Sequence, residues 1–197
     1  MTEFRGFPKI PRYSRECVIT EKIDGTNASV IIVRADGQES LPGGCAVVTG
    51  AYPEIYTVTA GSRNRLICPT DDNHGFAAWV WEHAEELVRG LGGGVHFGEW
   101  WGCGINRGYG LQEKRFSLFN TTRWGEARPA CCHVVPVIER GIFHSWLVER
   151  AIEKLHADGS AAAPGFKNPE GVVIYHTAGN LMFKKTLHRD EEWKGKR

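Results

Sequence analysis

The stretch that decides the fold is Glu21-Lys22-Ile23-Asp24-Gly25-Thr26-Asn27, where a lysine ends an apolar run and an Asp-Gly turn signal follows at once. The runs on either side, 17–22 and 28–33, are rich in β-branched residues and predict two strands joined as a hairpin or a tight β-turn-β unit. The plainest interpretation of the charges is an exposed hairpin turn. A lysine can also act as a nucleophile when its amine is neutral and partly desolvated, so Lys22 is the first candidate for chemistry.

Short β-branched or aromatic runs and two helical patterns make up the rest of the chain. We expect strands at 46–49, 55–60, 95–101, 115–120, 133–138, 171–176 and 181–187, and helices at about 74–90 and 143–157. Asp72 or Asn73 would cap the first helix, and Gly159 would end the second. This order predicts an α+β fold of antiparallel sheets with flanking helices. We expect a single domain over 1–197, with no separate OB-fold or C-terminal domain.

Composition limits the classes of function. Of the 197 residues, 42% are hydrophobic and 11% aromatic, which is ample for a core. The net charge of +1 argues against a broadly basic nucleic-acid coat but allows a local basic groove. No apolar run is long enough for a transmembrane helix, and the start of the chain lacks the apolar stretch of a secretory signal. We therefore expect a cytoplasmic protein with no membrane partner.

Six cysteines occur without a CxxC pair. The cluster Cys131-Cys132-His133 suggests zinc, but adjacent ligands without a matching second pair suit a tetrahedral site poorly. We expect free buried thiols in a reducing cytoplasm instead.

Charged side chains recur in three of the predicted strands. Alternation puts Glu99 on one face with aromatic residues, and Glu170 begins an otherwise apolar strand. In 181–187 it sends Lys184 to one face and Lys185 to the other. Each signal is weak by itself, because strand ends often carry charge and a lone carboxylate often pairs with a surface lysine. Their order along the chain is what carries information.

Six motifs occur in a fixed order: Lys22-x-Asp24-Gly25-x-Asn27, then 62–65 (SRNR), 97–100 (FGEW), 116–119 (FSLF), 170–173 (EGVV) and 183–185 (FKK). Together they strongly resemble the collinear motifs of the covalent nucleotidyltransferase superfamily, which contains ATP-dependent DNA ligases, RNA ligases and mRNA capping enzymes. The resemblance runs from about 17 to 186. It implies the ATP-grasp-like nucleotidyltransferase (adenylation) domain of polynucleotide ligases.

The resemblance also implies a reaction and a set of site residues. Lys22 would attack the α-phosphorus of ATP and form a lysyl-AMP intermediate, with Mg²⁺ or Mn²⁺ as the metal. The residues implied to contact ATP are Glu21, Ile23, Asp24, Asn27, Arg63, Arg65, Glu99, Phe119, Lys184 and Lys185, and those implied at the metal are Asp24, Glu99 and Glu170.

Particular roles follow from the same resemblance. Phe119 would stack on adenine, Glu99 would hydrogen-bond the ribose, and Arg63 would bind the ribose and later a nucleic-acid phosphate. Glu21 lies where members of the family recognise the adenine amine, partly through backbone groups. Glu170 would hold the metal through water molecules, since Mg²⁺ sheds water reluctantly.

Two positions refine this expectation. Asn27 favours the RNA-ligase branch, because DNA ligases and capping enzymes usually have arginine there. The last motif usually has two lysines spaced by one residue, whereas Lys184 and Lys185 are adjacent and Thr186 stands at the second position. Strand alternation favours Lys184 as the phosphate contact.

The resulting hypothesis is an ATP-dependent RNA ligase that transfers AMP to a 5′-phosphate and joins it to a 3′-hydroxyl. The alternatives are a DNA-nick ligase, a stand-alone polynucleotide adenylyltransferase and a non-catalytic module that binds nucleic-acid ends. We expect a monomer from a bacterial or phage-infected cell that binds RNA ends or nicks. A partner protein that helps to hold the nucleic acid is a further expectation. Candidate basic contacts are Arg5, Lys9, Arg12, Arg15, Arg107, Lys114 and Arg115, and the plainer interpretation of these residues is a solvated face.

Overall fold

The computed structural model describes residues 4, 6–35, 46–51 and 54–188. The chain divides into two compact units, and each has a sheet of its own. Unit 1 comprises Met1–Lys22 and Val137–Arg197, and unit 2 comprises Ile23–Pro136. The boundary falls inside the stretch that holds the first motif, directly after Lys22. The expectation of one domain over 1–197 stays a prediction.

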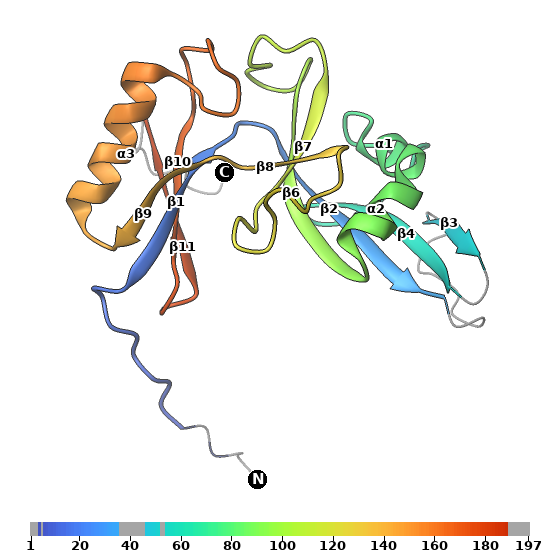
Figure 1. Ribbon diagram of the computed structural model, residues 1–197, viewed down its shortest axis with the longest axis horizontal. Coiled ribbons are helices and arrows are strands. Elements are labelled where there is room, and N and C mark those ends of the chain that lie inside the picture. Colours follow the sequence, from blue (N-terminus) through green and yellow to red (C-terminus); the bar gives the residue numbers. More distant parts are fainter. Residues whose placement is uncertain (1–3, 5, 36–45, 52–53, 189–197) are drawn as a thin grey trace. The chain divides into compact units, whose positions relative to one another are not determined.

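Unit 1 is a four-stranded antiparallel sheet with one helix. The strands lie in the order β11 (Leu181–Thr186), β10 (Gly171–His176), β1 (Glu16–Lys22) and β9 (Val137–Ile142). Helix α3 (Ser145–Asp158) runs along this sheet (Figure 1). The core lies between them and includes Cys17, Ile19, Leu147, Ala151, Leu155, Val172 and Ile174.

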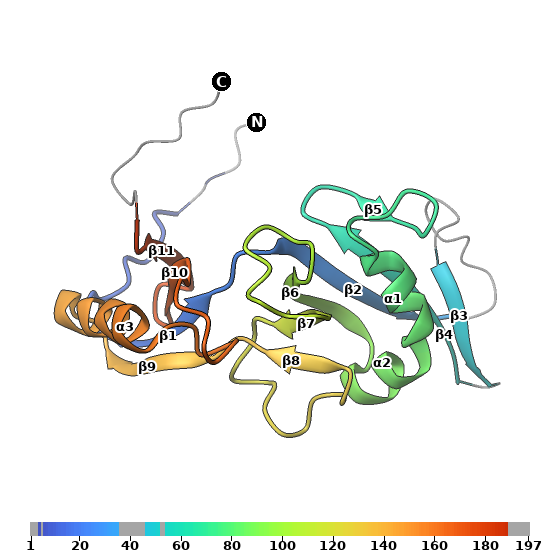
Figure 2. The ribbon, with the colours of Figure 1, turned by 90° about the horizontal axis from the view of Figure 1, so that it is seen from above.

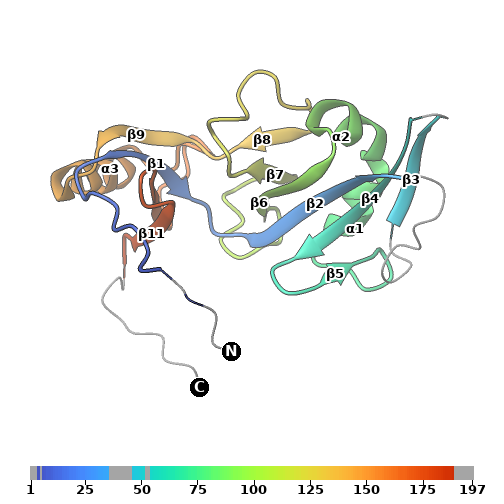
Figure 3. The same ribbon diagram turned by 90° about the horizontal axis from the view of Figure 1, so that it is seen from below.

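Unit 2 is a larger sheet with two short helices. Its strands are β3 (Ala46–Ala51), β4 (Glu54–Ser62), β2 (Thr26–Arg34), β6 (Gly94–Gly102), β7 (Lys114–Leu118) and β8 (Cys132–Val134), in that order, with β5 (Leu66–Ile67) on β4. All neighbours are antiparallel except β7 and β8. Helices α1 (Phe76–Glu82) and α2 (Ala84–Leu91) pack on one face of this sheet (Figure 2), and β3 forms one edge (Figure 3). The antiparallel α+β fold is therefore confirmed.

The predicted hairpin between the first two strands is wrong. Strand β1 pairs with β9 and β10, whereas β2 pairs with β4 and β6 in the other sheet. The Asp24-Gly25 turn signal is real, but it marks a link from one sheet to another. Gly25 is needed there because a Cβ atom would lie 2.4 Å from the carbonyl oxygen of Trp100. A turn signal reports only local backbone geometry and does not say which strands will pair.

The predicted helix at 74–90 is two helices. His83 interrupts it with φ −102° and ψ 12° and is followed at once by α2. The N-cap position is Gly75 rather than Asp72 or Asn73, but the Asp72 carboxylate still accepts hydrogen bonds from the backbone N–H groups of Ala77 (2.8 Å) and Ala78 (3.0 Å). These bonds satisfy donors that the first helical turn leaves unpaired.

The predicted strand at 133–138 is also two strands. It breaks at Val135-Pro136, after β8 and before β9, and the two pieces belong to different sheets. Proline lacks the N–H that a central strand needs, which explains the break. Gly159 ends α3 at φ 88°, as predicted. The five described cysteines are free thiols, as expected, but only Cys17 and Cys132 are buried and Cys103 is exposed; Cys45 lies outside the described residues. Across the described ranges, no helix is long and apolar enough to cross a membrane.

Candidate active site

Lys22 and Glu170 form an ion pair at one end of the unit 1 sheet. Lys22 is the last residue of β1 and stands opposite Gly171, so Glu170 lies one residue beyond that pair. The Nζ atom of Lys22 donates to Oε2 of Glu170 at 2.5 Å. The two side chains are 25% and 19% exposed, so the pair is partly shielded but still open to a ligand.

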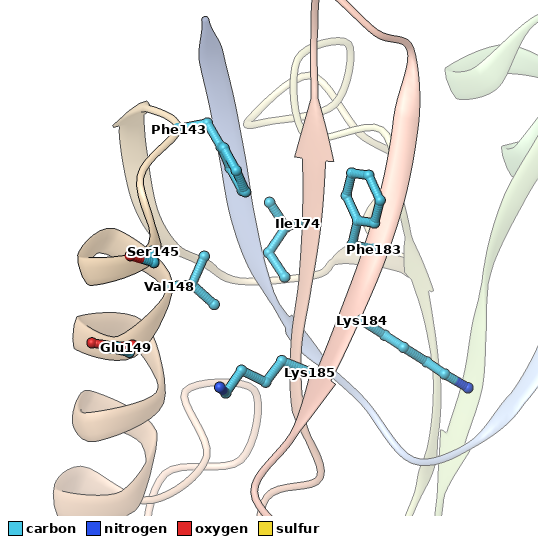
Figure 4. Close-up of a pocket in the computed structure, with 8 residues that line it drawn as sticks. All are labelled: Phe143, Ser145, Val148, Glu149, Ile174, Phe183, Lys184 and Lys185. Atoms are coloured by element: carbon cyan, nitrogen blue, oxygen red, sulfur yellow. The ribbon is translucent and has the colours of Figure 1, made fainter. Parts of the chain in front are cut away.

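The two adjacent lysines of β11 lie on opposite faces of this sheet. Lys185 stands opposite Val172, which is buried against α3, and Lys184 stands opposite Val173. Figure 4 shows the Lys185 side chain on the side of α3 and the Lys184 side chain directed away from it. By the alternation of the paired strands, Lys22 lies on the face of Lys184.

Lys185 points toward α3 into a pocket on that face, whose lining also includes Lys184. This pocket has a volume of about 250 Å³, and its polar lining includes Ser145 and Glu149 of α3 (Figure 4). The adjacency of the two lysines in sequence therefore does not put both beside Lys22.

Glu21 occupies the α3 face and is only 1% exposed. Its carboxylate accepts hydrogen bonds from the Ser160 hydroxyl (2.6 Å) and from the backbone N–H groups of Ala161 (2.8 Å) and Ala162 (2.9 Å). Burial raises the pKa of Glu21, and the three hydrogen bonds act in the opposite direction. The side chain thus ties β1 to the loop after α3. Adenine recognition by Glu21, if carried by backbone groups, stays a prediction.

Asp24 begins the second group of candidate residues, which lies in unit 2. Its carboxylate accepts hydrogen bonds from Nε of Arg107 (2.9 Å) and Nδ2 of Asn106 (3.0 Å). Its backbone N–H donates to the hydroxyl of Tyr109 at 2.8 Å. Three side chains of one loop therefore hold Asp24, and we call 103–113 the clamp loop.

The clamp loop is shaped by left-handed backbone positions. Asn106 (φ 44°) and Tyr109 (φ 52°) adopt them, as do Gly104, Gly108 and Gly110. The buried Tyr109 ring packs edge-on against Trp101, with 4.9 Å between centroids. The roles of Asn106 and Tyr109 were not predicted from the sequence. The glycine density of this segment indicates turns, but nothing in it identifies Asp24 as the group they hold.

Three basic residues that were expected to contact nucleic acid already have partners inside unit 2. Arg107 pairs with the carboxylate described above, Lys114 donates to the carbonyl of His74 at 2.8 Å, and Arg115 donates to Glu113 at 2.9 Å. Their contact with nucleic acid stays a prediction. Arg5 lies outside the described residues.

The face of the unit 2 sheet away from its helices holds two more candidates, Asn27 and Glu99, and Phe119 lies next to it. Asn27 of β2 stands opposite Glu99 of β6, and Oε1 of Glu99 accepts a hydrogen bond from the N–H of Gly25 at 3.2 Å. Phe119 follows β7 rather than lying in it, and its N–H donates to the carbonyl of Phe97 at 3.0 Å. Both rings are exposed, Phe119 by 38% and Phe97 by 56%, so each can stack on a planar ligand.

The surroundings of the other predicted residues give less indication of a binding role. Arg65 forms a two-armed ion pair with Asp71, with Nη2 to Oδ1 at 3.0 Å. Arg63 is exposed in the turn after β4, and Ile23 is 4% exposed, which leaves mainly its backbone for ligand contact. The three predicted metal residues are divided between Glu170 of unit 1 and the pair Asp24 and Glu99 of unit 2. No cluster of three or more His, Cys, Asp or Glu side chains suited to a metal occurs among the residues that the structure describes.

The fold is that of RNA-ligase nucleotidyltransferase domains. Naegleria gruberi RNA ligase with PPi aligns with a TM-score of 0.56 and 18% identity, over 88% of this chain and 50% of that one. A mutant of the same ligase with ATP and Mn gives 0.56 and 17%, over 89% and 51%, and an apo mutant gives 0.53 and 19%, over 88% and 50%. The chain thus spans about half the length of these solved structures. No curated protein matches its sequence.

The family itself is established by sequence. The family model described as RNA ligase matches residues 15–186, from the residue before β1 to the last residue of β11. The protein belongs to the RNA ligase family.

Proposed function

We propose that this protein is an ATP-dependent RNA ligase in which Lys22 becomes covalently attached to AMP. The observation that carries the proposal is the contact of 2.5 Å between Nζ of Lys22 and Oε2 of Glu170, in a chain of the RNA ligase family. A nucleophilic lysine must be held in one position and partly shielded from water, and this pair meets both needs. Solved structures of the Naegleria gruberi ligase contain ATP, AMP or PPi, which are the donor and the two parts into which it divides.

The first step would be attack of the Lys22 nitrogen on the α-phosphorus of ATP. An N–P bond forms, the bond from that phosphorus to the bridging oxygen breaks, and pyrophosphate leaves. Two protons leave the lysine ammonium for solvent overall, one to free its lone pair and one as the new bond forms. Phosphoryl transfer depends mostly on alignment and on neutralising charge. Glu170 supplies alignment, because it holds the nitrogen at the end of β1.

Lys184 and a divalent cation would neutralise the negative charge of the ATP phosphates. Lys184 lies on the face of Lys22, so it is the β11 lysine suited to contact phosphate. Mg²⁺ and Mn²⁺ commonly bind through one or two carboxylates together with substrate phosphates and water. The Glu170 carboxylate is 19% exposed, so it could bind such an ion together with water and substrate phosphates. Such an ion supplies positive charge beside the phosphates when bound.

The residues of unit 2 would serve the nucleotide in the ways that the resemblance implies. Phe119 is a half-exposed ring suited to adenine, and Glu99 is a carboxylate suited to ribose hydroxyl groups. Asp24 is held by the clamp loop, which favours a positioning role over a freely mobile one. These assignments remain part of the proposal.

Two further steps would complete ligation. An oxygen of an RNA 5′-phosphate attacks the AMP phosphorus, the N–P bond breaks, and the leaving nitrogen takes up two protons from solvent to regenerate the Lys22 ammonium. The 3′-hydroxyl of a second end then attacks the 5′-phosphate, its proton goes to solvent, and AMP leaves.

The test is incubation with ATP labelled at the α-phosphate and with Mg²⁺ or Mn²⁺, followed by denaturing electrophoresis. We expect acid-labile label on the wild-type protein, none on Lys22→Ala, and none with GTP. Label on a folded Lys22→Ala protein would overturn the assignment of the nucleophile. A folded wild-type protein that takes no label would favour a module that only binds nucleic-acid ends. Supplying a nicked DNA duplex and a single-stranded RNA to the labelled protein separates the DNA-nick and RNA alternatives.

A further inference from the structure

The segment before β1 repeats its chemistry every three residues. Within 4–15, apolar side chains stand at 4, 7, 10 and 13, and basic ones stand at 9, 12 and 15. Pro8 and Pro11 fix φ near −65° and bias the residue before each toward extended conformations. In an extended chain with about three residues per turn, this period gathers apolar groups along one edge and basic groups along another. We call residues 4 and 6–15 the N-terminal arm.

The arm exposes these groups almost completely. Phe4 (91%), Phe7 (85%) and Ile10 (75%) are the most exposed large hydrophobic side chains of the described residues. Residues 6–12 belong to no helix or strand. Lys9 and Arg12 are exposed, and neither takes part in an ion pair within the described ranges. The rings and cations are therefore available to a ligand.

The C-terminal end of the arm is fixed to the body of unit 1. The Tyr13 ring packs edge-on against Phe143 with 5.0 Å between centroids, and the Tyr13 carbonyl accepts a hydrogen bond from Nε2 of His176 at 2.8 Å. The N–H of Phe143 donates to the carbonyl of Arg15 at 2.8 Å. The free rings thus extend from an anchored base, which reduces the entropy lost when they bind.

We infer that the N-terminal arm binds single-stranded RNA, with bases stacked on Phe4 and Phe7 and phosphates paired with Lys9 and Arg12. The inference rests on the proposed function, since it names the contact through which that RNA substrate is held. Aromatic rings interleaved with cations are the usual means of binding single strands with little sequence preference. Residues 4–15 hold four basic residues and no acidic one, so their charge complements a polyanion.

A groove on a partner protein is the competing occupant, and it would use the same apolar edge. The two ligands differ in what they need from the arm. RNA needs the flat ring at each aromatic position, whereas an apolar groove accepts leucine nearly as well as phenylalanine. RNA also needs the cations, and its affinity falls with salt in proportion to the number of phosphate contacts.

The first measurement is the binding of a short 5′-phosphorylated, fluorescent single-stranded RNA by anisotropy, with the full chain. Phe4→Leu/Phe7→Leu should weaken binding by roughly tenfold or more, and Phe4→Tyr/Phe7→Tyr should bind as wild type. All variants should keep the thermal midpoint and the labelling of Lys22 by ATP alone. Wild-type affinity in the leucine variant would overturn base stacking and favour an apolar partner.

The second measurement is the salt dependence of the same binding. Lys9→Gln/Arg12→Gln should make the slope of log K against log salt shallower by about 1.4, or about 0.7 for each lost phosphate contact. Arg140→Gln/Lys167→Gln removes the same charge elsewhere in unit 1 and should leave the slope unchanged. An equal change in both variants, or in neither, would overturn the assignment of the cations. Failure of the wild type to label with ATP, with arm variants still defective in RNA binding, would refute the proposed function and leave this inference standing.

Discussion

The Nζ atom of Lys22 lies 2.5 Å from Oε2 of Glu170, although the two residues are 148 positions apart in the chain. Glu170→Gln keeps the size of the side chain but removes its charge. We expect the initial rate of labelling by ATP to fall by roughly 10- to 100-fold, because a hydrogen bond to a charged group contributes about 1.5–3 kcal/mol. Glu149→Gln, on α3 of the same unit, is the control that should label normally. Normal labelling by Glu170→Gln would remove Glu170 from the site.

The adjacent lysines of β11 offer a matched pair of variants. Lys184→Ala should slow labelling on the order of 100-fold, because it removes a charge suited to the developing negative charge on phosphate. Lys185→Ala makes the same chemical change on the α3 face and should label within about threefold of wild type, as expected for a charge on the other face. Initial rates at saturating ATP are the measurement. Equal defects in both variants would contradict the division of roles by face.

The clamp loop should matter through its hold on Asp24. Arg107→Gln removes the ion pair with Asp24, which is 2.9 Å long and about three-quarters shielded on each side. We expect labelling to slow by roughly tenfold, because a less ordered Asp24 leaves the nucleotide less well positioned. Arg115→Gln removes a neighbouring cation that pairs with Glu113 instead. If the two variants label equally well, the clamp loop has no part in the chemistry.

A pH-dependent contribution to stability should come from Glu139 of β9. Hydrogen bonds from Arg150 and Lys154 of α3 hold the pKa of this carboxyl below its usual range. A lowered folded-state pKa stabilises the protein above the unfolded-state pKa of about 4.3, and that stability is lost as the pH falls through the folded-state pKa.

The corresponding variant is Glu139→Gln. At pH 7 it should lower the free energy of unfolding by about 1 kcal/mol, a modest value because both cations are half exposed. The difference from wild type should shrink as the pH falls below about 4. Glu153→Gln, an exposed change on α3, should leave the thermal midpoint unchanged at every pH. A pH-independent difference would mean that packing rather than charge holds Glu139.

Much of the fold was predictable from local pattern. The strands around Lys22, the alternation in β6 and β11 and the hydrogen bonding of Asp72 to the start of α1 were correct, because side-chain periodicity and capping depend on neighbours in sequence. The errors concerned which strands pair with one another and whether a predicted strand is continuous. The first two strands joined different sheets, and the apolar run at 133–138 broke at Pro136. Choice of strand partner depends on residues far away in the chain, which no local window contains.

The sequence by itself determined the family and the identity of the candidate nucleophile, because the order of the six motifs can be recognised without knowing which residues are in contact. Only the tertiary structure decided which charged groups meet. In the folded protein Lys22 contacts Glu170, and Lys184 and Lys185 lie on opposite faces of the sheet. The Asp24 carboxylate accepts hydrogen bonds from Asn106 and Arg107. The physical reason is range: a hydrogen bond or ion pair acts over about 3 Å, so its partner is set by strand register and loop path.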